Sequence, residues 1–179
     1  AGLSINHKNN ELFASEGEFG LDIRQFIFGF SHKLSPRSGL GVGVNYYTVG
    51  NIEVREGATD AYTEITDVSD LVILAGYGIS PILPLSFGLT AKVINEKLYR
   101  DEGRAYAFDI GSIYRKDFLR LGAALQNIGG NMKFKNESFP LPMMLRTGAA
   151  LSLPFKNAIL SADFAQSLKN SDDRSFHVG

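Results

Sequence analysis

The sequence lacks cysteine and tryptophan altogether, and its 179 residues carry a net charge of only -1. Without cysteine, neither a disulfide framework nor a thiolate metal site can form. With no excess of basic residues and no run of like charges, there is no basic surface to attract nucleic acid. We therefore expect no nucleic-acid partner and no cofactor or metal.

Long hydrophobic runs are also missing, because no stretch approaches the roughly 20 consecutive apolar residues that a membrane-spanning helix needs. The opening residues show no basic segment followed by an apolar core, so we expect no export signal within this sequence. Enzyme motifs are equally scarce. The three histidines form no metal-binding pair, and no Gly-x-Ser-x-Gly elbow occurs. We expect a non-enzymatic protein, although a hydrolase of the outer-membrane kind that uses His32 or His177 stays open.

What the sequence does contain is glycine, phenylalanine and tyrosine, at 19, 13 and 7 residues, in a pattern of period two. In residues 39–49 the apolar side chains of Leu40, Val42 and Val44 alternate with Gly41 and Gly43. Such alternation predicts β-strands. Strands are expected at residues 11–19, 25–34, 39–49, 71–79, 85–93, 106–111, 119–126, 145–153 and 158–167, with a last one beginning at residue 175.

The expected connections between these strands alternate in length. Short links are predicted at residues 35–38, 80–84, 116–118 and 154–157, and long ones at residues 50–70, 97–104, 129–144 and 168–174. Tight turns at one end and longer loops at the other are typical of outer-membrane barrels. Strands of about ten residues also suit a tilted crossing of the hydrocarbon layer.

The polar face of each strand decides between a membrane barrel and a soluble β-sandwich or barrel. A water-exposed face would be rich in charge, but here it is mostly Gly, Ala, Ser, Thr and Asn. We therefore predict an all-β, antiparallel, up-and-down transmembrane β-barrel with the small residues inside. We expect residues 1–179 to form one domain of about nine and a half strands. Because open sheet edges are not tolerated in lipid, we expect the native barrel to be larger than this chain, or a partner or a truncation to account for the remainder.

Four segments resemble one known family. Ala1-Gly2-Leu3 resembles the end of an Asn-Pro-Ala-Gly-Leu motif, and residues 41–46 resemble a glycine-alternating third strand. Residues 125–129 resemble a Leu-Gln-Asn-Leu-Gly segment, and residues 141–148 a Leu-Pro-x-x-Leu-Arg-x-Gly segment. A further segment, residues 176–179, resembles the opening of the strand that follows. These segments resemble, in this order, parts of the PorV and PorQ family of outer-membrane proteins, relatives of the FadL transporters.

The resemblance implies a FadL-like barrel of about 14 strands in the bacterial outer membrane. It also implies a role as a non-enzymatic component of type IX protein secretion, with the translocon or cargo proteins as partners. The alternative is a FadL-like channel for hydrophobic small molecules, and a purely structural envelope protein is a third possibility. In each case the lipid bilayer is the first partner, and a hydrophobic ligand or detergent is another.

Two sets of residues are candidate binding sites. Five charged side chains fall on the predicted inner face, where they either line a polar passage or only neutralise one another. They are Lys92, Asp109, Arg120, Arg146 and Asp163. The predicted loop at residues 129–144 carries apolar side chains that contact a partner or ligand, or fold over the barrel mouth. They are Met132, Phe134, Phe139 and Met143. The acidic segment at residues 50–70 is expected to be a solvated loop, with cation or protein binding as the alternative.

Overall fold

The computed structural model describes residues 1–5, 8–20, 22–55, 57–58, 61–135, 137–153, 158–169 and 174–179. These residues form one antiparallel sheet of twelve strands and a short 3-10 turn, η1. The elements in chain order are η1 (Gly2–Ile5), β1 (Asn10–Phe19), β2 (Ile23–Ser35), β3 (Ser38–Val54), β4 (Glu64–Ile82), β5 (Leu85–Leu98), β6 (Asp101–Lys116), β7 (Leu119–Ile128), β8 (Asn131–Lys133), β9 (Ser138–Pro140), β10 (Met144–Leu153), β11 (Ala158–Ser167) and β12 (Arg174–Val178).

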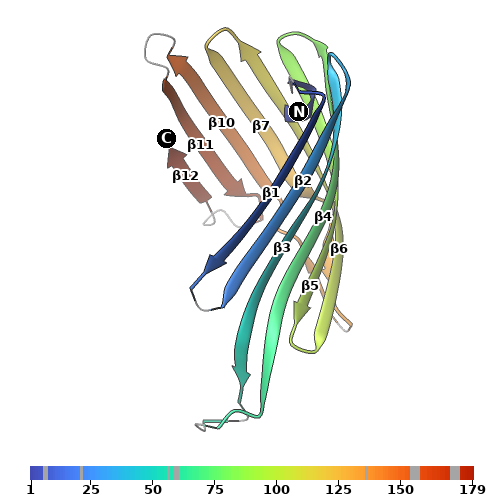
Figure 1. Cartoon of the computed structure of the whole chain (residues 1–179), viewed down its shortest axis with the longest axis vertical. Helices are drawn as coiled ribbons and strands as arrows, with labels where there is room; N and C mark the ends of the chain where they lie inside the picture. The colour runs from blue at the N-terminus through green and yellow to red at the C-terminus, as the bar shows by residue number, and fades with distance from the viewer. Residues whose placement is uncertain are drawn as a thin grey trace.

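The sheet is an up-and-down meander. Neighbours in the chain are neighbours in space from β1 to β7, and then through β10, β11 and β12, while β8 and β9 form a small hairpin beside β6. The predicted all-β antiparallel architecture is thereby confirmed. The sheet is strongly curved, with the N-terminal segment on its concave side, but β1 and β12 do not pair and the sheet is not closed (Figure 1). The described residues therefore form an open curved sheet, and its membership of a larger closed barrel stays a prediction.

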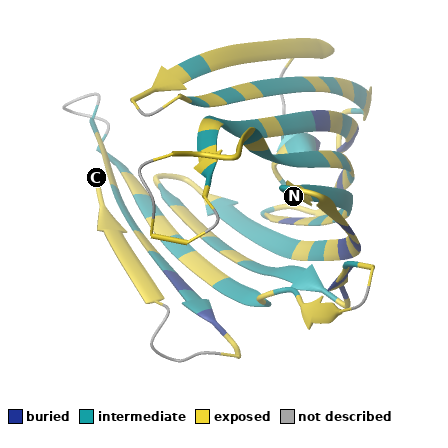
Figure 2. Cartoon of the chain, turned by 90° about the horizontal axis from the view of Figure 1, so that it is seen from below, coloured by how far each residue is buried: buried dark blue, intermediate teal, exposed yellow. Residues whose placement is uncertain are grey.

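The two faces of the sheet differ as the alternation predicts. Cross-strand partners share a face, and one such row runs through Gly39, Gly78, Gly88 and Gly111 on the concave side. The convex side carries large apolar residues that stay exposed, such as Leu89 at 51%. Figure 2 shows the resulting alternation of exposed and less exposed residues along the strands.

The connections at one end of the sheet are as short as predicted, with turns at residues 36–37, 83–84 and 117–118. The predicted turn at residues 154–157 lies outside the described residues. At the opposite end two predictions are wrong. Residues 97–104 form no long loop, because β5 and β6 continue to a two-residue turn at Tyr99 and Arg100. Residues 50–70 lie largely within the ends of β3 and β4.

The physical reason is that β3 to β6 extend past the apolar part of the sheet. In these extensions charged residues such as Glu53, Glu64 and Asp67 are interspersed with apolar ones and interrupt the alternation, so their composition resembles that of a loop. The predicted loop at residues 129–144 also contains structure, namely β8 and β9. Of the predicted loop at residues 168–174, residues 170–173 lie outside the described part of the chain.

Candidate functional site

The N-terminal segment lies against glycines on the concave face of the sheet. A Cβ atom added at Gly39 would lie 2.5 Å from the backbone oxygen of Leu3, and one at Gly78 would lie 2.9 Å from the backbone nitrogen of Ser4. Neither separation is possible between non-bonded atoms, so any larger residue would displace η1 from the wall. The glycines at 39 and 78 therefore allow the backbone of η1 to approach the backbones of β3 and β4 closely.

Hydrogen bonds between three serines fix the docked segment. The Ser80 hydroxyl lies 2.9 Å from the Ser4 oxygen and 2.6 Å from the Ser86 oxygen, and all three residues are at most 5% exposed. The Ser4 hydroxyl also lies 2.8 Å from the carbonyl oxygen of Ala1. These contacts join η1 to β4 and β5, beside the short turns. Sequence reasoning did not identify this cluster, because isolated serines in strands carry no recognisable motif.

Between the N-terminal segment and the wall formed by β6, β7, β10 and β11 lies an open cavity of about 890 Å³. Its floor consists of small residues, which leave room above the sheet: Gly111, Gly122, Ala124, Gly148 and Ala150. Ala1 and Ile5 line it from the side of η1. This cavity is the candidate functional site.

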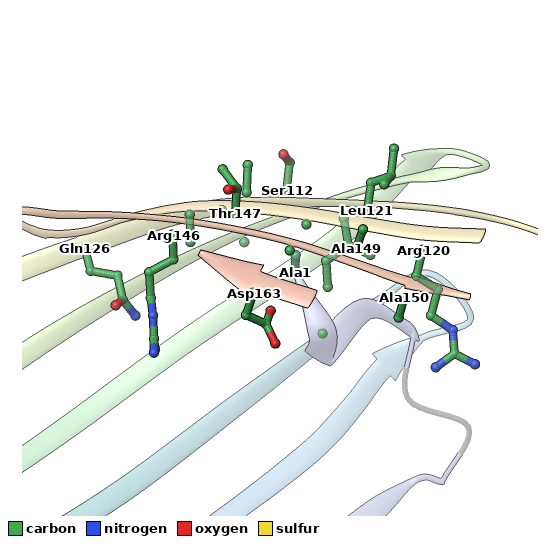
Figure 3. Close-up of a pocket in the computed structure, with 18 of the residues that line it drawn as sticks. Ala1, Ser112, Arg120, Leu121, Gln126, Arg146, Thr147, Ala149, Ala150 and Asp163 are labelled. Carbon is green, nitrogen blue, oxygen red and sulfur yellow. The ribbon is translucent and has the colours of Figure 1, made fainter. Parts of the chain in front are cut away.

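Four of the five charged residues predicted to face inward line this cavity, namely Asp109, Arg120, Arg146 and Asp163. Figure 3 shows Arg120, Arg146 and Asp163 projecting from the same side of the sheet, whereas Leu121 points to the opposite side. The carboxylate of Asp163 lies over the next strand, where a Cβ at residue 148 would be 2.3 Å from its oxygen. The alternation thus placed these side chains on the correct face.

The expectation that the inner charges neutralise one another holds for only one pair. Lys92 Nζ lies 2.7 Å from the Asp109 carboxylate, and both side chains are less than a fifth exposed. Among the described residues, Arg120, Arg146 and Asp163 have no ion partner within 4.0 Å. The cavity therefore keeps two cationic groups and one carboxylate available to water or a ligand.

Asn127 organises the paired charges. It adopts a left-handed backbone conformation with φ of 60° at the irregular junction between β6 and β7. Its backbone N-H donates to Asp109 at 2.9 Å, and its side-chain oxygen accepts from Lys92 at 2.6 Å. Its side-chain N-H group also donates to the carbonyl of Pro142 at 3.0 Å. Sequence reasoning did not assign this role to Asn127, although asparagine is among the residues that best tolerate this conformation.

The apolar residues predicted in the loop at 129–144 fold back onto the sheet. Met132 in β8 is buried, and the Phe134 ring lies where a Cβ of Gly103 would be, 2.7 Å away. The Phe134 and Phe139 rings meet edge to face, 6.3 Å apart, and Phe139 remains 52% exposed. Met143 is half-buried before β10. This segment therefore packs back onto the end of β6, and its contact with a partner or ligand stays a prediction.

In the extension of β3 to β6 the acidic residues do not gather into a cation site. Among the described residues, no group of three or more His, Asp or Glu side chains is placed to hold a metal ion. Glu64 instead accepts hydrogen bonds from Tyr99 and Arg100, and these bonds hold the pKa of its carboxyl below the usual value. This cluster ties the β5–β6 turn to the start of β4.

The histidines do not form a catalytic arrangement within the described residues. His32 Nδ1 lies 2.7 Å from the side-chain oxygen of Asn10 at the edge of the sheet. His177 lies at the rim of the cavity opposite Asp163 on the neighbouring strand, without a hydrogen bond to it in the described structure. His7 lies outside the described residues.

Neither a scan against protein-family models nor a search of curated proteins gives a match to this sequence. Among the described residues, no helix is long and apolar enough to cross a membrane.

Proposed function

We propose that this chain forms the wall of a β-barrel in a bacterial outer membrane. One observation carries this proposal: the apolar rows of the curved sheet lie exposed on its convex face, while the glycines and the charges of the cavity lie inside. We call these rows the apolar band. Its exposed members include Phe26, Phe30, Leu40, Val42, Ile73, Phe87, Leu89, Phe108, Ile110, Leu121 and Leu151.

Exposure on this scale is costly in water, at about 25 cal/mol per Å² of apolar surface. In a bilayer the same surface is solvated by hydrocarbon. The β4 part of the band runs from Leu71 to Ile79, a length of the order that a tilted strand needs to cross the membrane. The open edges at β1 and β12 need partners in lipid, since unpaired backbone groups are not tolerated there. Further strands in the manner of a 14-stranded barrel would supply them.

Membrane fractionation tests this location. The protein should remain in the outer-membrane fraction through an alkaline carbonate wash and be released by detergent. Recovery of a monodisperse, water-soluble protein without detergent would contradict it.

Within that location, we propose a non-enzymatic role in protein export. Its support is the ordered series of segments that resemble the PorV and PorQ family, together with the exposed Phe139 at the end of the sheet where the strands extend furthest. Gentle detergent extraction followed by co-purification tests this role. A translocon component or a cargo protein should be recovered with the chain, and the Phe139→Ser variant should retain less of it. Recovery of the chain alone would count against an export role.

The cavity favours a second candidate, a channel for hydrophobic compounds that carry an anionic group. It combines small apolar residues with Arg120 and Arg146, which have no ion partner within 4.0 Å among the residues that the structure describes. Uptake of such a compound should fall when both arginines are changed to glutamine, and be unaffected when Arg55, remote from the cavity, is changed in the same way. Unaltered uptake in the double variant would exclude this role for the cavity.

A further inference from the structure

The end of the sheet with the short turns carries an unusual charge distribution. We define the short-turn rim as the residues within three positions of the turns at 36–37, 83–84 and 117–118. This rim contains five cationic side chains and a single carboxylate, that of Asp117. The cations are Lys33, Arg37, Arg115, Lys116 and Arg120.

These cations have no ion partner within 4.0 Å among the described residues. At this end the Lys8–Glu11 pair lies beside Lys33 without including any of these cations, whereas three ion pairs form at the opposite end of the sheet. They are Arg24 with Glu18, Arg55 with Glu53, and Arg100 with Glu64. Arg115 and Arg120 even face each other across β6 and β7, an arrangement of like charges that destabilises a sheet. Among the described residues the rim therefore carries a net positive charge that no ion pair neutralises.

Large apolar side chains stand among these cations. Ile82 and Leu83 at the β4–β5 turn are 71% and 64% exposed, and Phe118 at the β6–β7 turn is 57% exposed. Along β4 and β5 this apolar surface continues into the apolar band through Ile79 and Leu85. A turn that continues a lipid-facing surface belongs at the boundary of the hydrocarbon, where basic residues meet lipid headgroups.

One cation is held in place beside the apolar turn. A guanidinium N-H of Arg37 points at the carbonyl oxygen of Pro81, 3.5 Å away, and this contact lays the side chain against the β4–β5 turn. Lys116 lies on the convex face, because its cross-strand partner is Leu119, which belongs to the apolar row of β7. Both cations are exposed. They therefore lie where headgroup phosphates would meet the outer surface of the wall.

We propose that Arg37 and Lys116 of the short-turn rim bind the headgroups of anionic phospholipids in the adjacent leaflet, whereas Lys33, Arg115 and Arg120 lie on the concave face. This inference rests on the proposed membrane location and adds a lipid preference to it. An acidic protein would also match the charge. The exposed apolar side chains of the β4–β5 turn favour lipid over an acidic protein, because Ile82 and Leu83 continue the surface that faces hydrocarbon.

The test compares lipid retention by the protein and by two matched variants. The protein is reconstituted in vesicles of phosphatidylcholine mixed with phosphatidylglycerol and extracted in mild detergent, and bound lipids are counted by native mass spectrometry. Phosphatidylglycerol should be enriched over its share of the vesicle. The Arg37→Gln/Lys116→Gln variant should lose this enrichment, by about fivefold for each cation removed, since each basic residue at an anionic surface contributes about 1 kcal/mol.

The control is the Arg24→Gln/Lys97→Gln variant, which removes two convex-facing cations from the opposite end and should keep the enrichment. Equal losses in both variants would overturn the proposal, since they would indicate an unspecific effect of net charge. Insertion without any enrichment would overturn it while leaving the membrane location intact. Failure to enter vesicles at all would instead contradict the proposed function. Binding of polyglutamate to the rim without lipid enrichment would identify a protein-docking surface and refute the lipid proposal.

Discussion

Replacing Gly39 by alanine should release the N-terminal segment from the concave wall. The added Cβ would lie 2.5 Å from the backbone oxygen of Leu3, well inside van der Waals contact, and backbone on both sides prevents a local adjustment. The segment must therefore move away from β3 and β4. Displacement removes the hydrogen bond between Ser4 and Ser80 and the packing of the half-buried Leu3 side chain.

The hydrogen bond contributes about 1 kcal/mol, and the packing of a half-buried leucine about another 1 kcal/mol. A loss of about 2 kcal/mol corresponds to a shift of about 30-fold in the equilibrium between the docked and released segment, at 1.4 kcal/mol for each tenfold change. The sheet itself should remain intact, because alanine is better tolerated in a strand than glycine.

Hydrogen exchange of the N-terminal peptide, followed by mass spectrometry in detergent, measures this equilibrium. Gly29→Ala is the matched control, since it lies in a neighbouring strand of the same sheet and its added Cβ would meet no atom within 4 Å. Because docking contributes about 2 kcal/mol, the peptide should exchange about 30-fold faster in Gly39→Ala. In the control it should exchange at the original rate. Equal exchange in the two variants would refute the close-approach explanation of the glycine wall.

Three further predictions test other parts of the structure. Leu89→Arg places a charge in the apolar band and should destabilise the membrane-inserted protein by about 2–4 kcal/mol. The control Ile65→Arg, in the strand extension, should have little effect on chemical unfolding. Equal destabilisation of the two variants would contradict the location of the band. Asp109→Asn leaves Lys92 with a weaker partner and should lower the free energy of unfolding by about 2 kcal/mol. The stability of Asp109→Glu should be closer to that of the original protein. Unchanged thermal stability of Asp109→Asn would argue against a structural ion pair. The hydrogen-bonded Glu64 has a lowered pKa in the folded state, so its contribution is present above the ordinary value of 4.5 and is lost as the pH falls through the folded value; amide exchange at the β5–β6 turn should accelerate on acidification, and much less so in Glu64→Gln.

The alternation of apolar and small residues predicted most of the sheet. Residues 158–167 were predicted as a strand and are β11 with the same bounds. The inward placement of Arg120, Arg146 and Asp163 also followed from period two, because the pleat leaves only two faces. The alternation within each strand was therefore enough to assign which side chains face the cavity.

Other features could not be predicted from the alternation. The charged ends of β5 and β6 resemble a loop, because strands that project into water lose their apolar rows. The role of Gly39 and Gly78 could not be seen either, since the small face of a strand does not reveal which segment approaches it. Asn127 was missed because its role depends on a register shift between β6 and β7, which arises from pairing and not from composition.

Nitroxide scanning of β4 determines whether the apolar rows of the sheet face lipid. The natural absence of cysteine allows single cysteines to be introduced one at a time at residues 71–75 and labelled. In reconstituted vesicles, labels at 71, 73 and 75 should be relaxed by oxygen dissolved in lipid and shielded from a water-soluble nickel chelate, while labels at 72 and 74 should show little relaxation by oxygen. Relaxation of the labels at 71, 73 and 75 by the aqueous chelate would contradict the membrane assignment and the proposals that depend on it.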